Sequence, residues 1–482
     1  MLRCHFLPAQ LARRRAGSLT ALAAALFLQA CAQLPDLAQA PQPKSAEAFQ
    51  SGTSLQAAAA DWPLDQWWTA YGDAQLNTLI DEALLGSPDL AAATARLQRA
   101  QAMTQVSGSA LKPQLSANAA LSEERLSYNN LLPRATMPHG WNDYGRVSLD
   151  FRWELDFWGK NRAALAAATS ELEASRAELA QARLMLASGV AASYAELSRL
   201  YANRDTAAQS VDIRQKTAEL FVRRYANGLE TRGSLREADA RRAVAEGALL
   251  ALDEQIALQR NHLAALLGAG PDRGLTITAP TLKLNHSFGL PPELAVNLLG
   301  RRPDVVAARL QAQAQASRIA QKKAEFYPNV NLSAFVGVQS LGLDNLDKSG
   351  SSIGSLGPAI SLPLFTAGRL QGELRGSQAR YAETVANYNA TVTRALQEVA
   401  NNAVSQKALG QRLQKAQEAV EAASESHRVA RNRYDGGLAN YLEVLSAEDG
   451  LLNSLSAQTN LRSASLSLDI DLQRALGGGY QL

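Results

Sequence analysis

The sequence predicts a mixed but mainly α-helical protein that arose by tandem duplication and carries a smaller β component. The residue pattern of 159–268 recurs as a diverged repeat at 368–477, and a turn interrupts each copy at the same position. Each copy begins with a long proline-free stretch that, at about 1.5 Å per residue, would form a helix roughly 100 Å long. The residues just before the first long stretch alternate between apolar and polar side chains, which is typical of a strand.

The spacing of the repeated residues defines the expected domain organisation. Tyr225 and Tyr434 are 209 positions apart, whereas Pro113 and Pro328 are 215 apart. A tandem duplication with a six-residue length change between the proline and the long helix accounts for both spacings. The expected segments are therefore a first repeat at 61–270, a linker at 271–300 and a second repeat at 301–482.

The N-terminal residues predict export and a lipid anchor. Residues 1–30 resemble a secretory signal, with arginines followed by an apolar run too short to span a membrane. The run ends in a Leu-Gln-Ala-Cys sequence that resembles the bacterial lipobox, so we expect Cys31 to become the lipidated first residue. Residues 31–60 are rich in Ala, Gln and Pro, which predicts a flexible tether. Ala32 favours the outer membrane, since an Asp there would resemble the signal for inner-membrane retention. The alternative is an ordinary signal with a chance cysteine, because Gln29 stands where a small residue is more common.

Four segments predict strands that could cross a membrane. From 146 to 157 the odd positions are apolar and the even positions are charged or polar. Weaker alternation at 114–127, 329–338 and 357–365 predicts three further strands, which complete hairpins at 114–157 and 329–365. Strands of about this length span membranes, with an apolar face toward lipid and a polar face toward water. The alternative is a soluble sheet with one buried face. The candidates for a water-filled lumen are Arg146, Asp150, Arg152, Glu154 and Asp156.

The number of strands predicts a homotrimer. Four strands cannot close a barrel, and open strand edges are not tolerated in lipid. The small closed barrels have about eight strands, whereas three chains would supply twelve, enough to enclose water. Short helices expected at 88–112 and 229–267 together match the long helix at 160–227 in length, so they could line up beside it. We therefore expect a trimeric duct in which a 12-stranded β-barrel is continued by a long α-helical barrel.

Composition and motifs argue against catalysis. The net charge of +3 and the 19% of charged residues give no reason to expect a nucleic-acid partner. The five histidines have no metal-ligand spacing, and no glycine-rich phosphate loop is present. Glu154 and Asp156 could mimic a catalytic carboxylate pair, but the alternation around them makes a pore wall the better interpretation. We therefore expect no enzyme activity and no cofactor other than the covalent lipid on Cys31.

A set of short motifs gives the chain a family resemblance that covers essentially all of the mature chain. The motifs are Trp67-Trp68, Gly72-Asp73, Ser87-Pro88-Asp89-Leu90, the run Trp153 to Gly159, Arg301-Arg302-Pro303-Asp304, Phe326-Tyr327-Pro328, Leu362-Pro363-Leu364-Phe365, Arg433-Tyr434 with Gly437, and Ala475 to Tyr480. In this order, the chain resembles the TolC/OprM family of outer-membrane efflux channels (outer-membrane factors), in its lipoprotein (NodT-like) branch. The resemblance implies a trimer with an outer-membrane β-barrel, a periplasmic α-barrel and an equatorial collar, to which the linker at 271–300 would contribute.

The resemblance also implies function and partners. The family exports drugs or other small toxic molecules without chemistry of its own, and it docks on a periplasmic adaptor protein and an inner-membrane pump. A protein-secretion duct with the same fold remains an alternative, as does a periplasmic coiled-coil scaffold from a different functional class. Neither the transported substrate nor the type of pump follows from the sequence.

The resemblance places a gate at the two turns between helices, 225–233 and 434–440. Arg433 and Tyr434 match basic and aromatic residues that hold the family's channels closed, and Glu443 falls where the family has a ring of aspartates. Ser446 and Ser234 depart from that pattern, since both positions are often Asp. Simple packing of Tyr434 and a solvated carboxylate at Glu443 are the alternatives. The candidate gate residues are Arg433, Tyr434, Glu443, Tyr225 and Glu237, with Gly228 and Gly437 as hinges.

Overall fold

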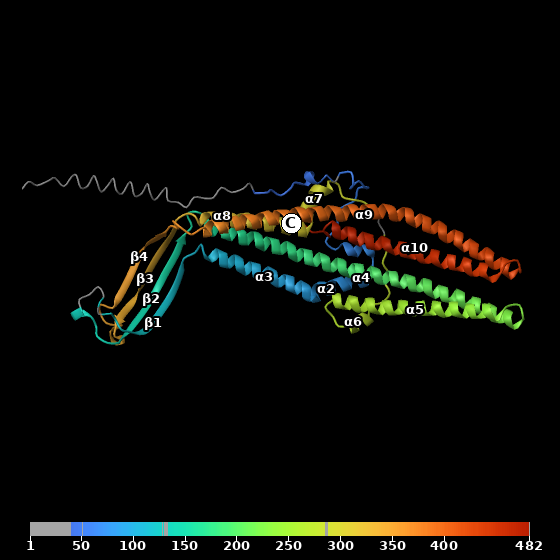
Figure 1. Cartoon of the computed structure of the whole chain (residues 1–482), viewed down its shortest axis with the longest axis horizontal. Helices are drawn as coiled ribbons and strands as arrows, with labels where there is room; N and C mark the ends of the chain where they lie inside the picture. Colours follow the sequence, from blue (N-terminus) through green and yellow to red (C-terminus); the bar gives the residue numbers. More distant parts are fainter. Residues whose placement is uncertain (1–39, 51, 128, 130–133, 285–287, 482) are drawn as a thin grey trace, which may run out of the picture. The chain divides into compact units, whose positions relative to one another are not determined.

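The computed structural model describes residues 40–50, 52–127, 129, 134–284 and 288–481 (Figure 1). The predicted signal at 1–30 and the predicted lipidation site Cys31 lie outside the described residues, as does the first part of the predicted tether. The chain divides into two compact units, and each unit contains segments of both sequence repeats. Counting described residues only, unit 1 consists of 40–42, Gln98–Glu173 and Arg309–Ala386, and unit 2 consists of Pro43–Leu97, Ala174–Ala308 and 387–481.

Unit 1 contains a four-stranded antiparallel sheet in the order β1-β2-β3-β4, whose strands lie side by side in Figure 1. The strands are β1 (Gln114–Glu124), β2 (Asn142–Leu155), β3 (Asn329–Leu341) and β4 (Ser352–Ser361). The prediction of a strand at 357–365 was wrong at both ends. β4 ends before Leu362-Pro363, because proline has no backbone N–H to donate and restricts the residue before it.

The helices follow the expected pattern. The two long helices are α4 (Lys160–Ala226) and α9 (Arg369–Asp435), and each is followed by a 35-residue helix, α5 (Arg232–Leu266) or α10 (Tyr441–Ala475). The helices before the sheet segments, α3 (Pro88–Ser109) and α8 (Pro303–Ala324), end a few residues before Pro113 and Pro328. Within the described part of the chain, no helix has both the length and the hydropathy of a membrane span.

Unit 2 has its main core where short elements pack on the long helices. The helix α2 (Ala74–Gly86) and the 3-10 helix η2 (Trp67–Tyr71) bury Trp68, Leu76 and Ile80 against apolar residues of α4 and α5. Asp73 caps α2 and also accepts hydrogen bonds from the hydroxyl of Tyr194 and the backbone N–H of Thr281. A second core forms around α7 (Leu294–Arg301), and the short helix α6 (Asp272–Leu275) follows α5. The described residues of the 271–300 segment thus pack on the helices of unit 2.

Candidate functional site

The two helix turns of unit 2 are built by glycine. Gly228 and Gly437 both have φ of 72°, a left-handed conformation that other residues adopt only with strain. At the end of each long helix, the backbone N–H groups of the glycine and of the residue after it donate to carbonyls of the last helical turn. Thr231 and Asn440 are the N-cap residues of the helices that follow, α5 and α10. The structure therefore places Gly228 and Gly437 at the points where the chain reverses, and Figure 1 shows both turns at the same end of the helices.

Tyr434 links the two turns. Its hydroxyl donates a hydrogen bond to Oε1 of Glu230 at 2.7 Å, which joins the end of α9 to the turn between α4 and α5. Tyr434 is 3% exposed, and its ring lies parallel to that of Phe221 at 6.2 Å between centroids, with the guanidinium of Arg224 4.5 Å from the ring centroid. Burial, together with the hydrogen bond to Glu230, raises the pKa of Tyr434, so the phenol remains a neutral donor. We call Phe221, Arg224, Glu230, Tyr434 and Tyr441 the turn cluster.

Arg433 and Glu443 pair with each other. The guanidinium of Arg433 donates to Oε2 of Glu443 at 3.1 Å and also to the backbone carbonyl of Leu438 at 3.2 Å. Both side chains are about half exposed, so the pair ties the turn between α9 and α10 to itself. Within one chain, the negative charge of Glu443 is therefore paired with the positive charge of Arg433 in the same pair of helices.

The structure does not bring the other two gate candidates into the turn cluster. The side chain of Tyr225, the counterpart of Tyr434 in the first repeat, is 44% exposed. Glu237 forms an ion pair with Arg241 at 3.1 Å, and Arg241 also binds Asp449 of α10 at 2.8 Å. Sequence reasoning missed Phe221 and Arg224. The signal that could have found them is their spacing on α4, because residues three apart lie on one face of a helix.

The sheet of unit 1 has one apolar and one polar face. The register aligns Leu115, Phe151, Ala334 and Leu356 in one row across the strands. Two residues further along, and therefore on the same face, it aligns Ala117, Leu149 and Val336. Much of this face is uncovered in the chain, since the side chain of Leu149 is 48% exposed. An apolar surface of this kind marks a contact with lipid or with another protein.

The opposite face carries polar and charged side chains. The carboxylate of Asp150 accepts hydrogen bonds from Asn118 of β1 and Ser148 of β2, each at 2.8 Å. The guanidinium of Arg146 lies 5.1 Å from the ring of Phe335, an aromatic exception on this face. The register gives Arg146, Asp150, Arg152 and Glu154 the same side of β2, so the structure brings four of the five lumen candidates together.

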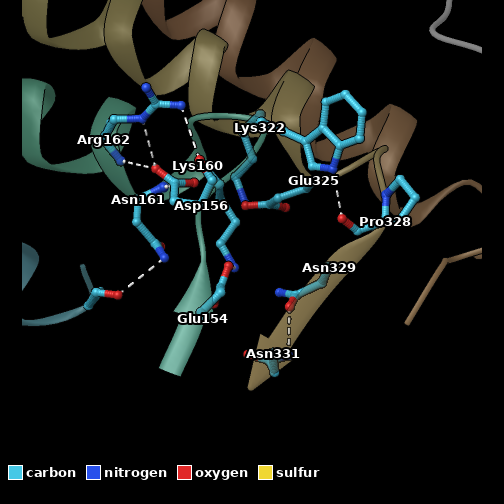
Figure 2. A network of polar contacts seen from close by, with 12 residues as sticks. Glu154, Asp156, Lys160, Asn161, Arg162, Lys322, Glu325, Pro328, Asn329 and Asn331 are labelled. Atoms are coloured by element: carbon cyan, nitrogen blue, oxygen red, sulfur yellow. Dashed lines mark hydrogen bonds and ion pairs between the residues drawn. The ribbon is translucent and has the colours of Figure 1, made fainter. Parts of the chain in front are cut away.

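The assignment of Asp156 to the polar face of the strand was wrong. β2 ends at Leu155, and the Asp156 carboxylate caps the start of α4 by accepting from the backbone N–H groups of Asn161 at 3.1 Å and Arg162 at 2.8 Å (Figure 2). A carboxylate is stabilised at a helix N-terminus because it satisfies free N–H groups there. Next to it, Glu154 forms an ion pair with Lys160 at 2.5 Å.

Two tryptophans donate hydrogen bonds to the short segments that connect helices to strands. The indole N–H of Trp158 donates to the carbonyl of Pro328 at 2.9 Å, and its ring stacks on Tyr327 at 4.8 Å. The indole N–H of Trp153 donates to the carbonyl of Leu111 at 3.1 Å. These bonds satisfy backbone carbonyls just before β1 and β3, and they join β2 and the residues after it to the segments between the helices and those strands.

Strands with one lipid-compatible face, in a chain whose duplicated helices meet at linked turns, define a class of two-repeat membrane channel proteins. The family model described as "Outer membrane efflux protein" matches residues 79–269 and 294–478. The multidrug resistance outer membrane protein MdtP of Escherichia coli K12 is 31% identical over 467 residues, which cover 95% of this chain and 96% of MdtP. The fusaric acid resistance protein FusA of Burkholderia cepacia is 36% identical over 368 residues, or 75% of this chain and 69% of FusA.

Solved structures agree with the family match. The crystal structure of the outer membrane protein VceC from Vibrio cholerae is similar with a TM-score of 0.83 and 49% identity, covering 87% of this chain and all of that one. The Campylobacter jejuni CmeC outer membrane channel shares the fold, with a TM-score of 0.83 and 22% identity over 93% of this chain. The chain belongs to the outer membrane efflux protein family. It is an outer-membrane protein that functions in efflux.

Proposed function

We propose that the protein is the passive exit duct of a tripartite efflux system, which receives drugs or other small toxic compounds from an inner-membrane pump through a periplasmic adaptor. The observation that carries this proposal is the two-faced sheet. Its strands of 11, 14, 13 and 10 residues are long enough to cross a membrane, one face is apolar and uncovered, and the other is polar enough to line water.

The duct would need no chemistry of its own. Among the residues that the structure describes, no three His, Cys, Asp or Glu side chains lie close enough together to hold a metal ion. The polar face of the sheet carries both signs of charge, which suits a conduit for varied solutes better than a site for one ligand. In this proposal selectivity resides in the pump, and the duct contributes passage and closure.

Closure is proposed to lie at the turn cluster. A duct that joins the periplasm to the outside must be shut at rest, and the turns at Gly228 and Gly437 are where the helices can pivot. The Tyr434–Glu230 hydrogen bond and the Arg433–Glu443 ion pair are the contacts that such a movement would break.

Cys31 is proposed to carry the lipid that tethers the N-terminus to the outer membrane. The uncovered apolar face of the sheet would hold the protein in the membrane independently, so the lipid would assist assembly rather than provide the only attachment. Labelled palmitate entering the wild type but not Cys31→Ser would support this assignment, and equal labelling of both would reject it.

Deletion of the gene tests the proposed function. We expect the deletion strain to become several-fold more sensitive to a panel of small toxic compounds that includes fusaric acid and cationic dyes, with sensitivity restored by the wild-type gene. Unchanged sensitivity together with the loss of a secreted protein from the medium would indicate a secretion duct. Unchanged sensitivity and secretion, with altered cell-envelope shape, would indicate a scaffold.

A further inference from the structure

Glu448 is a buried carboxyl group that the proposed gate does not use. It lies on α10 two helical turns after Tyr441, and its side chain is 1% exposed. Its Oε2 accepts a hydrogen bond from the hydroxyl of Thr217 on α4 at 3.3 Å. Its Oε1 has no hydrogen-bond partner among the described residues, because the nearest guanidinium nitrogen, Nε of Arg214, is 3.9 Å away.

The arginines around Glu448 are already paired with other carboxylates. Arg214 of α4 and Arg241 of α5 each donate to Asp449 at 2.8 Å, and Arg241 also donates to Glu237 of α5 at 3.1 Å. Two positive charges thus face the two negative charges of Asp449 and Glu237. Glu448 is the third carboxyl group beside these two arginines. If it were ionised, three negative charges would face two positive charges.

Burial favours the neutral form of such a carboxyl group. Removing a carboxylate from water costs free energy unless it is paired and hydrogen-bonded, and the group gains a proton instead. Burial raises the pKa of Glu448, an effect that Arg214 and the Thr217 hydroxyl oppose only in part. The hydroxyl of Tyr441 is also buried without a hydrogen-bond partner among the described residues, and burial together with the charge of Glu448 raises the pKa of this phenol.

The surroundings of Glu448 are continuous with the turn cluster. The Tyr441 ring contacts Phe221 at 3.8 Å and lies 5.9 Å from the Tyr434 ring. These rings share one hydrophobic cluster with Val444 and Leu445, which lie between Tyr441 and Glu448 on α10. Tyr434, at the end of α9, contributes its neutral phenol to the same cluster. A change of charge at Glu448 would therefore act on the packing that holds Tyr434 against Glu230.

We propose that Glu448 is a proton-binding site that regulates the gate: its carboxyl is protonated while the turn cluster is closed, and losing the proton as pH rises weakens the cluster. The regulatory part rests on the proposed position of the gate. The proton-binding part stands on the burial of Glu448 and on the charges around it.

The direction of the pH effect follows from linkage. A carboxyl group whose pKa is raised in the closed state stabilises that state fully below its ordinary pKa of about 4.3. The stabilisation is lost as pH rises toward the raised pKa, and it is absent above that value. Within this window the equilibrium constant for opening the cluster should rise by up to about tenfold per pH unit.

Hydrogen–deuterium exchange of the full-length protein in detergent tests the proton site directly. Protection of peptides within 434–449, corrected for intrinsic exchange, is compared between wild type and Glu448→Gln from pH 5 to 8. We expect wild-type protection to fall relative to Glu448→Gln by up to about tenfold per pH unit, then to level off. The matched control is Asp239→Asn, since Asp239 is the counterpart of Glu448 in the first repeat but is 33% exposed and paired with Arg236. That variant should follow the wild type.

Two further measurements keep the outcome clear. Thr217→Val removes a donor to the ionised carboxylate, so it should extend the pH window upward even if Glu448→Gln does not fold. A constant protection ratio between wild type and Glu448→Gln, with no upward shift in Thr217→Val, would overturn the proton site. Single-channel conductance of the same proteins tests the gate separately. Proton-linked protection without any pH dependence of conductance would contradict the gate position and leave the proton site standing.

Discussion

At the scale of single residues, Tyr434 should determine how firmly the turns are held together. Tyr434→Phe removes the hydroxyl that donates to Glu230 and retains the ring that stacks on Phe221. A hydrogen bond to a charged group contributes about 1.5–3 kcal/mol net, so the closed state should weaken measurably. We expect a higher single-channel conductance in planar bilayers for Tyr434→Phe than for the wild type.

The repeat supplies a control for this change. Tyr225 occupies the position of Tyr434 in the first repeat, but its side chain is 44% exposed and lies outside the turn cluster. Tyr225→Phe should leave conductance unchanged. If Tyr434→Phe conducts like the wild type while Tyr225→Phe conducts more, the contact that closes the duct involves the first-repeat tyrosine instead.

The unequal roles of these two tyrosines show which part of the site could be predicted from the sequence. The turn glycines were identified from the repeated breaks in the sequence, and Arg433 and Tyr434 from the family resemblance. The ring of Tyr434 stacks on Phe221, whose counterpart in the second repeat is Ala430, so the repeat does not offer Tyr225 the same aromatic partner. Such pairing arises from the packing of four helices, and no spacing along the chain specifies it.

At the scale of elements, the two faces of β2 should tolerate different substitutions. Leu149→Arg would place a charge on the apolar face between Ala117 and Val336, at a cost of roughly 2–4 kcal/mol if that face meets the middle of the bilayer. We expect this variant to be depleted from the outer-membrane fraction. Arg152→Ala, on the polar face, should assemble normally and change only ion selectivity. Assembly lost in Arg152→Ala and kept in Leu149→Arg would reverse the two faces.

Element boundaries were predictable where proline, glycine or strict alternation marks them. The ends of α4 and α9 came from the turn glycines, and β2 came from its strict alternation. β4 alternates weakly and contains Gly354 and Gly357, a residue type that is depleted in strands, so its start at Ser352 was missed. Asp156 was misplaced for a related reason, since the alternation continues past the last ladder pair into the cap of α4.

At the scale of the whole molecule, the free edges of the sheet determine the assembly that we propose. Among the described residues of one chain, β1 pairs only with β2 and β4 only with β3, so each outer strand has an edge without a described partner. Unpaired backbone groups are not tolerated in lipid, so β1 of one copy should pair with β4 of the next. Two chains would give eight strands, a barrel just wide enough to be filled by side chains. The charged face formed by Arg146, Asp150, Arg152 and Glu154 requires water, which favours three chains and twelve strands.

Cysteine cross-linking tests this closure. Ala117→Cys, in the middle of β1, is combined in turn with cysteines at positions 352–361 along β4, and the native membranes are oxidised. Inside one chain these strands are three spacings apart, about 14 Å, so a disulfide cannot form within the monomer. We therefore expect at least one pairing to give covalent dimers and trimers on denaturing gels, with no larger species. The matched control combines Ala117→Cys with Ala334→Cys on the central strand β3, which should give no cross-link. A ladder that stops at two copies or continues beyond three would contradict the trimer.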